Sequence, residues 1–180
     1  MHEQQIALGV VNIIGGILVL GSYYLGARAH PGTAGEAWGG VPRRLKPFYV
    51  ASMLTAAAGY FAFTYYVLFS IEPEGIEVLG TLGFWAFILL YALILFPSAI
   101  WMPLTFAMLE RPRRGLWWAI RATLFVVGGT SVVLLIALLT VSRGDSGAVY
   151  WLAVVGSIAF CIQTALLDAL IWPVYFPVKE

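Results

Sequence analysis

The stretch from Val149 to Trp172 reads VYWLAVVGSIAFCIQTALLDALIW, and it contains a single charged residue, Asp168. An α-helix needs about 20 mostly apolar residues to cross the hydrocarbon core of a bilayer, so this stretch is predicted to span a membrane. The whole chain agrees, because 61% of its 180 residues are hydrophobic and only 11% are charged. Its mean hydropathy is +0.90. A water-soluble domain is about half apolar and about a quarter charged, so that class is excluded.

Four more apolar stretches precede this one, and polar breaks rich in glycine or proline separate all five. We therefore predict an all-α fold, an integral membrane bundle of five transmembrane helices that forms one domain over residues 1–180. Five spans do not divide into the inverted pair found in many secondary transporters, so a self-contained transporter of that kind is not favoured. The predicted spans are 6–25, 47–69, 79–101, 116–141 and 149–172.

Basic residues alternate between the predicted loops. Most of them fall in the first loop, the third loop and the C-terminal tail, whereas the other side holds one arginine and several acidic residues. Because basic loops stay in the cytoplasm, the N-terminus is predicted outside and the C-terminus inside. We expect a multi-pass protein of a bacterial-type cytoplasmic membrane. The basic residues on the predicted cytoplasmic side are Arg28, Arg43, Arg44, Lys46, Arg111, Arg113, Arg114 and Lys179.

The third apolar stretch is longer than a single crossing requires. From Leu79 to Leu109 it would extend roughly 45 Å as a helix, against a hydrocarbon core of about 30 Å. Pro97 and Pro103 lie in its second half, and proline inside a helix removes a backbone hydrogen bond. We therefore predict a bend near Pro97 and an interfacial or tilted segment from Trp101 onward.

Polar residues in the fifth span recur at helical spacing. Thr164 and Asp168, preceded by Ser157 and Cys161 at the same kind of spacing, are predicted to share one helix face. Such a face turns away from lipid, and helix packing is its simplest role. A carboxylate inside a span is costly, however, and marks a candidate functional site. Arg121 lies at a similar predicted depth and is the expected ion-pair partner of Asp168; alternatively, its side chain extends to the headgroups.

The sequence lacks the motifs of several well-known chemistries. His2 and His30 are the only histidines, and both lie outside the spans, which excludes a bis-histidine haem within the bilayer. No zinc-protease, nucleotide-binding or serine-hydrolase motif is present. Ten basic and nine acidic residues nearly cancel, so a nucleic-acid partner is not expected. No cofactor can be named, and a protein without enzymatic activity is favoured over an enzyme.

One short motif, Leu45-Lys46-Pro47, precedes the second span; another, Trp101-Met102-Pro103-Leu104-Thr105-Phe106, ends the third; and a last one, Leu167-Asp168-Ala169-Leu170-Ile171-Trp172, lies in the fifth. These three motifs resemble those of the TspO family, the tryptophan-rich sensory or translocator proteins. That family also has five spans, an outside N-terminus and a substantial first loop. Asp168 stands where the family has asparagine, and Met102 replaces one proline of a pair.

The resemblance implies a pocket beneath the first loop for a flat lipophilic ligand, such as a porphyrin or a sterol, and it allows a homodimer. The candidate binding residues are Trp38, Trp101, Phe106, Asp168 and Trp172. Two alternatives stay open. The chain could be an accessory or scaffolding subunit of a larger membrane protein complex, with no catalytic activity of its own. It could also be an intramembrane enzyme that uses Asp168 as an acid or base, although a single carboxylate does not identify the reaction.

Overall fold

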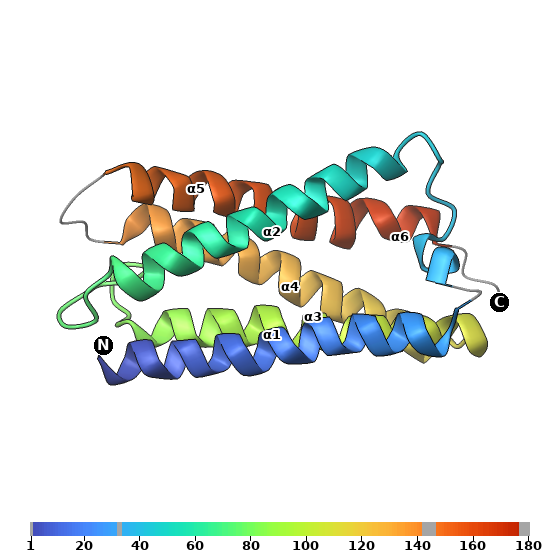
Figure 1. Ribbon diagram of the computed structural model, residues 1–180, viewed down its shortest axis with the longest axis horizontal. Helices are drawn as coiled ribbons and strands as arrows, with labels where there is room; N and C mark the ends of the chain where they lie inside the picture. Colours follow the sequence, from blue (N-terminus) through green and yellow to red (C-terminus); the bar gives the residue numbers. More distant parts are fainter. Residues whose placement is uncertain (1, 32–33, 142–146, 177–180) are drawn as a thin grey trace.

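The structure, a computed structural model, describes residues 2–31, 34–141 and 147–176. These residues include five helices that are long and apolar enough to cross a membrane, so the prediction of an all-α, five-span fold is confirmed (Figure 1). The first four are α1 (Glu3–Ala29), α2 (Lys46–Phe69), α3 (Trp85–Glu110) and α4 (Arg114–Thr140). The fifth joins α5 (Ala148–Cys161), η2 (Ile162–Ile171) and α6 (Trp172–Tyr175).

The helix starts follow local sequence signals. His2 caps α1, because its side chain accepts a hydrogen bond from the backbone N–H of Gln4 while the Gln5 side chain accepts one from the backbone N–H of His2. Pro47 occupies the first turn of α2, where its missing N–H costs no helical hydrogen bond. The loop between these helices contains a short 3-10 helix, η1 (Ala34–Trp38).

The third helix starts later than predicted. Residues before Trp85 form a turn, in which Val78 and Leu82 exchange backbone hydrogen bonds and Leu79 and Gly80 adopt positive φ. The part of the apolar stretch that precedes α3 therefore folds outside the helix, which shortens the helix that must cross the membrane.

The third helix also ends later than predicted. It continues through Pro97 and Pro103 as far as Glu110. At 1.5 Å per residue, α3 is about 39 Å long, which fits a bilayer of about 40–45 Å that includes the headgroups. The predicted interfacial segment from Trp101 onward is not formed, because α3 is one continuous helix and the turn before it removes the excess length. The predicted bend near Pro97 and the alternative of a tilted segment stay predictions.

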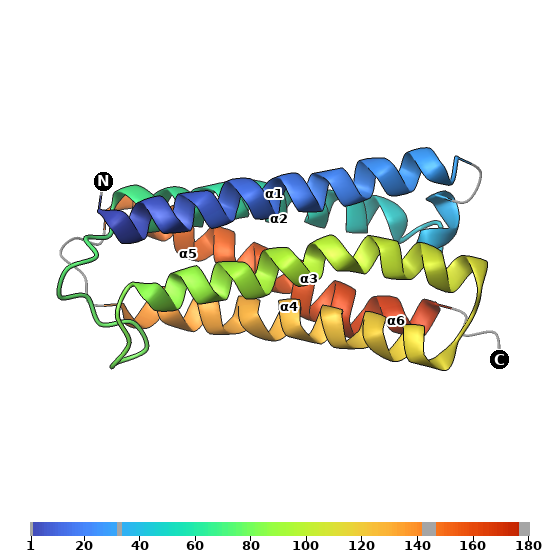
Figure 2. The same cartoon turned by 90° about the horizontal axis from the view of Figure 1, so that it is seen from below.

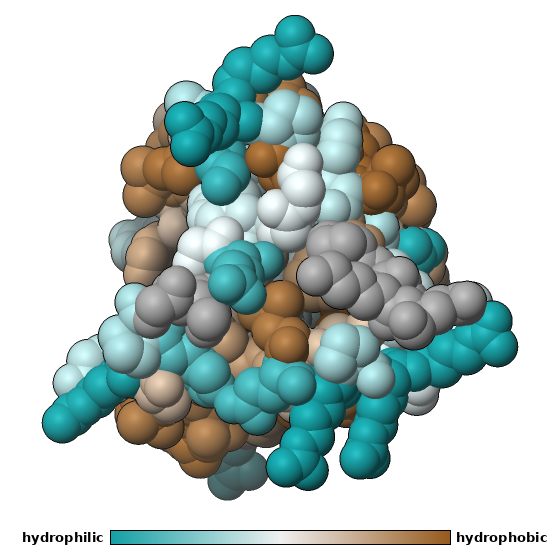
Figure 3. Space-filling model, turned by 90° about the vertical axis from the view of Figure 1, so that its right-hand side faces the viewer, coloured by the Kyte–Doolittle hydropathy of each residue, from teal (hydrophilic) through white to brown (hydrophobic). Residues whose placement is uncertain are grey.

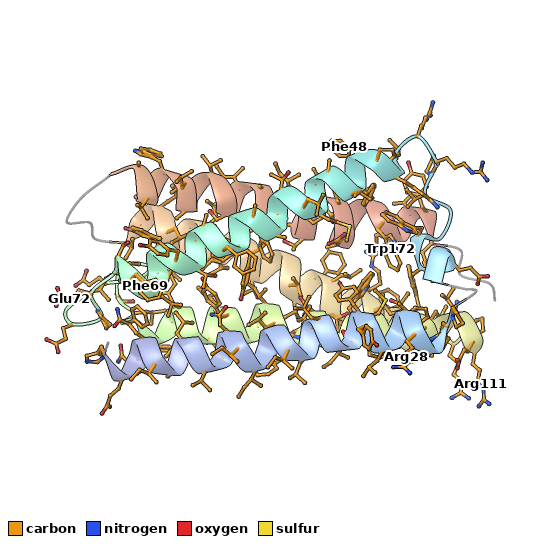
Figure 4. The ribbon with its side chains drawn as sticks, in the orientation of Figure 1. Arg28, Phe48, Phe69, Glu72, Arg111 and Trp172 are labelled. Carbon is orange, nitrogen blue, oxygen red and sulfur yellow. The ribbon has the colours of Figure 1, made fainter. Side chains whose placement is uncertain are left out.

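The two ends of the bundle differ in charge. We call the end where α1 begins the acidic end and the opposite end the basic end; Glu72 and Arg111 mark them in Figure 4. Figure 3 shows the basic end, where hydrophilic side chains project outward around the edge and hydrophobic residues cover the sides of the bundle. The acidic end holds Glu3, Glu72, Glu74 and Glu77, and the basic end holds Arg28, Arg43, Arg44, Lys46, Arg111, Arg113 and Arg114.

The helices pack in a ring that is nearly open at one place. α1 packs mainly against α3 and α2 mainly against α5, while α4 lies between α3 and the fifth helix (Figure 2). α1 and α2 hardly pack on each other, and they diverge from the acidic end toward the basic end (Figure 1). We call the line along which α1 and α2 face each other the seam.

The closest helix contact lies on the other side of α2. Gly59 of α2 meets Gly156 of α5, and a Cβ added to Gly156 would stand only 2.7 Å from the Gly59 Cα. No side chain fits between these backbones. Small residues allow such close approach between membrane helices, where van der Waals contact replaces the hydrophobic effect as the driving force.

Candidate functional site

The fifth helix changes type halfway along its length. After Cys161 the chain continues as a π-helix, η2, with hydrogen bonds between residues five positions apart. Gln163 and Asp168 are therefore neighbours, and Gln163 Nε2 donates to Asp168 Oδ1 at 2.8 Å. Gln163 is only 5% exposed, and its Oε1 atom has no hydrogen-bond partner among the described residues. Segments of π-helix are rare and occur frequently at functional sites.

The π-helix turns Asp168 away from the face that sequence spacing predicts. Thr164 faces α4, where its hydroxyl donates to the Ser131 hydroxyl at 2.8 Å. In an uninterrupted α-helix Asp168 would follow it on that face. Instead, the Asp168 carboxyl is close enough to interact electrostatically with the phenols of Tyr23 on α1 and Tyr49 on α2. Asp168 thus faces the seam.

The expected ion pair between Arg121 and Asp168 is not formed. In the ranges that the structure describes, the ion pairs are those of His2 and His30. The guanidinium of Arg121 lies over two aromatic rings of its own helix, 4.9 Å from the Phe125 ring centre and 5.9 Å from that of Trp117. Arg121 and Asp168 were expected to pair because they lie at a similar predicted depth in the membrane. Depth does not fix direction, however: η2 turns Asp168 toward the seam, while the Arg121 side chain lies over Phe125 and Trp117.

Two of the predicted tryptophans come together near the basic end. The rings of Trp101 and Trp172 are 5.8 Å apart at 74°, and Tyr23 lies 6.0 Å from Trp101. Trp172 is 4% exposed, and its Nε1 donates to the Ala37 carbonyl in η1 at 3.1 Å. The Trp101 Nε1 atom is also buried, but it has no hydrogen-bond partner within the described part of the chain.

We call Tyr23, Trp101, Gln163, Asp168 and Trp172 the seam cluster. They come from α1, α3, η2 and α6 and lie where α1 and α2 have diverged; Figure 4 shows Trp172 between the α2–α5 pair and the α1–α3 pair. Three of them, Tyr23, Trp101 and Asp168, remain partly accessible although they turn inward. Aromatic walls with a few convergent polar atoms are typical of small-molecule sites.

Trp38 lies at the edge of the seam cluster. Its ring packs edge-on against Tyr49 at 6.0 Å, and Lys46 Nζ lies 5.6 Å from its centre. The Tyr49 hydroxyl donates to the Leu167 carbonyl in η2 at 3.4 Å. Through these contacts the first loop packs against the basic end of α2, next to η2.

Phe106 does not join the seam cluster. Five positions beyond Trp101, it points about 140° away around the helix. Its ring stacks on His30 instead, at 4.2 Å and 5°. The structure therefore separates Phe106 from the other candidate binding residues, because the sequence motif gave proximity along the chain but not direction.

His30 fastens the end of α1 to the end of α3. Its Nε2 lies 2.8 Å from Glu110 Oε1, and its Nδ1 lies 3.0 Å from the Gly26 carbonyl oxygen. Both partners are acceptors, and both ring nitrogens can donate at once only when the imidazole is protonated. The hydrogen bond to Glu110, followed by the bond to Gly26, raises the pKa of His30 above its ordinary value. We call these two interactions of His30 the clamp; they fix the end of α1, which forms one side of the seam, to the end of α3.

The candidate binding residues predicted from the sequence do not include Tyr23 or Gln163, although Tyr23 lies on the predicted inward face of the first span. Gln163 lies off the α-helical stripe that ends at Asp168, so its polarity within an apolar span was the one available signal. Among the described residues, no three His, Cys, Asp or Glu side chains gather as a metal site would require. Comparison with family models, curated proteins and solved structures finds no match to this chain.

Proposed function

We propose that this chain is a receptor-like membrane protein that binds a flat lipophilic ligand at the seam cluster. Porphyrins, sterols and similar molecules have the required shape, and the TspO resemblance names the same ligands. The proposed site lies between α1 and α2, beneath the first loop, with Trp101 and Trp172 as its aromatic wall. Trp38 would bound the site from the loop, whereas Phe106 would support it from the α1–α3 contact.

The observation that carries this proposal is a pair of buried polar atoms without partners in the described chain, Trp101 Nε1 and Gln163 Oε1. Each unsatisfied polar group in hydrocarbon costs several kcal/mol, on the order of what a broken hydrogen bond costs in an apolar solvent. A ligand with one acceptor and one donor would satisfy both atoms. Its apolar body would cover the partly accessible rings of Tyr23 and Trp101.

Binding can be tested with protein reconstituted in phosphatidylcholine nanodiscs. Octaethylporphyrin, cholesterol and 9-aminoacridine serve as porphyrin, sterol and aromatic probes, and tryptophan fluorescence or radioligand retention reports occupancy. We expect saturable binding of at least one probe. Trp101→Phe should weaken it about tenfold, because a lost buried hydrogen bond costs about 1 kcal/mol or slightly more.

Trp118→Phe is the matched control, because Trp118 lies near the same end of the bundle but is 67% exposed. It should leave the affinity unchanged. Absence of saturable binding by all three probes would overturn the proposal. Equal effects of the two substitutions would remove the seam cluster as the site.

The alternative role, an accessory or scaffolding subunit, needs no ligand. Its partner surface would be an apolar outer face such as that of α1, where Ile13, Ile17 and Leu20 are 66%, 65% and 72% exposed. Lipid covers such a face equally well. Fixed partners that co-purify from the native membrane, together with no probe binding, would favour this role; a homodimer of the purified chain would be compatible with the receptor role.

The proposed site would open near the cytoplasmic leaflet if the basic end faces the cytoplasm, as the positive charges favour. A Gly35→Cys variant tests this orientation, because Gly35 lies in η1 at the basic end. Membrane-impermeant maleimide should label that cysteine only after the cytoplasmic side is exposed. Labelling in intact cells would reverse the orientation.

A further inference from the structure

We propose that the seam cluster selects a lipophilic cation, an aromatic molecule with a protonated nitrogen, through Asp168 and Gln163. This inference rests on the proposed function and narrows its ligand class. It starts from the Asp168 carboxyl group, which would need a counter-charge in order to be ionised inside the bundle. In the described part of the chain no lysine, arginine or histidine forms an ion pair with this carboxyl group, and its hydrogen-bond partner is the neutral amide of Gln163.

Arg121, the counter-charge expected from the sequence, forms no ion pair with Asp168. Arg121 lies over the rings of Phe125 and Trp117. A buried charge without a partner is strongly destabilising, whereas an ion pair with further hydrogen bonds restores the balance. A cationic ligand would supply the charge that the chain does not provide to Asp168.

The hydrogen-bonding groups of the seam cluster also match a cation. Gln163 donates one N–H of its amide to Asp168, and its Oε1 is a buried acceptor without a partner in the described chain. A protonated nitrogen carries donors only, so it can serve Gln163 and Asp168 together. An anionic group at the same place would meet two acceptors and a negative charge.

The aromatic residues complete this chemistry. The Trp101 ring lies 5.8 Å from that of Trp172 and 6.0 Å from that of Tyr23, and the Tyr23 phenol is in turn close enough to the Asp168 carboxyl group to interact electrostatically. Tryptophan and tyrosine faces attract cations, most strongly where water is excluded. The Trp101 N–H remains for an acceptor elsewhere on the ligand. The site is thus suited to a flat aromatic amine and not to a flat carboxylate.

The test compares two probes of the same three-ring shape in phosphatidylcholine nanodiscs. 9-Aminoacridine is protonated at neutral pH, and anthracene is uncharged. Binding to protein-free nanodiscs is subtracted, and Asp168→Asn removes the charge while keeping the side-chain shape. We expect the wild-type chain to prefer 9-aminoacridine, and Asp168→Asn to lower its affinity about tenfold, because hydrogen bonds to charged groups contribute about 1.5–3 kcal/mol. Anthracene binding should not change.

Glu72→Gln is the matched control, because it removes the same charge from an exposed residue at the acidic end. It should leave both affinities unchanged. Trp101→Phe, which keeps Asp168 but replaces the indole with a smaller aromatic face, should weaken both probes through lost contact area and preserve the preference for the cation. This second variant tests the inference even if Asp168→Asn fails to fold.

Equal wild-type affinities for the two probes, or equal losses in Asp168→Asn, would overturn the cation inference. If a neutral probe then still bound in a manner that depends on Trp101, the proposed receptor function would stand without it. If no probe bound saturably to any variant, both would fall.

Discussion

The two sides of α2 are built differently. Toward α5, the backbones of Gly59 and Gly156 touch, and no side chain separates them. Toward α1, the hydrogen bonds lie in the half nearer the acidic end, where Tyr60 donates to Asn12 at 2.6 Å and Gln5 donates to the Leu68 carbonyl at 2.9 Å. Beyond these bonds α2 diverges from α1 (Figure 1).

This difference explains where the seam cluster lies. Membrane helices gain little from the hydrophobic effect when they associate, so close backbone contact and hydrogen bonds hold them together. α2 packs mainly against α5, and the two glycines let the backbones touch, so van der Waals contact holds this pair together. In the basic half of the seam no hydrogen bond joins α1 to α2 among the described residues, and the nearby polar atoms of Trp101 and Gln163 have no partners there.

The largest effect should follow from a methyl group on the closed side of α2. Gly156→Ala would place a Cβ 2.7 Å from Gly59 Cα, and backbone on both sides leaves no room to adjust. We expect a loss of roughly 3 kcal/mol in the free energy of unfolding, at the upper end for an overpacked core. Denaturation in mixed detergent micelles measures it.

Gly16→Ala is the control for that change, because nothing lies within 4 Å of a Cβ built at Gly16. Alanine favours helix over glycine by roughly 1 kcal/mol, so this variant should be as stable as the wild type or more so. A similar loss in both variants would show that the α2–α5 contact is not special.

A smaller loss of stability should follow from a change in the half of the seam nearer the acidic end, where hydrogen bonds join α1 to α2. Tyr60→Phe removes the hydrogen bond to Asn12 and should cost about 0.6–1.7 kcal/mol, the range for such bonds between membrane helices. Tyr24→Phe is its control, because Tyr24 is 62% exposed. If Tyr60→Phe and Tyr24→Phe have the same free energy of unfolding, the hydrogen bond between Tyr60 and Asn12 does not hold α1 to α2.

The clamp at the end of α1 should respond to pH. Interaction with Glu110 raises the pKa of His30 above its ordinary value of 6.5, so its stabilising effect is complete below that pH and is lost as the pH rises through the higher value of the folded state. Amide exchange near the end of α1 should therefore accelerate beyond its intrinsic rate as the pH rises above the ordinary histidine value of 6.5.

His30→Gln should remove this extra pH dependence, because glutamine does not titrate. Glu110→Gln should reduce it, since the main cause of the raised pKa is the hydrogen bond to that carboxylate. The same pH profile in all three proteins would exclude His30 as the titrating group.

The smallest effect on stability should come from the open side. Trp101→Phe removes an N–H that has no partner in the described chain, which offsets the loss of ring area, and the free energy of unfolding should change by less than about 0.5 kcal/mol. The same variant should weaken ligand binding. A large loss of stability with unchanged binding would reassign Trp101 to packing and break the contrast between the two sides of α2.

The sequence alone determined the number of spans and the charges at the two ends. Hydrophobic length and the cost of polar groups in lipid are local properties, so each span could be placed without knowledge of its neighbours. The same cost identified Asp168 as an inward-facing residue. Proline gave less guidance, because α3 continues through Pro97 and Pro103 once the turn before Trp85 has shortened it.

Only the tertiary structure decided which residues meet. The α-helical spacing of the fifth span pointed Asp168 toward α4 and Arg121, whereas the π-helix turned it toward the seam and gave it Gln163 as a partner. Trp101 and Phe106 belong to one motif, yet they face different neighbours. A helix type and the direction of a side chain depend on what packs against each turn, and that information lies in residues far away along the chain.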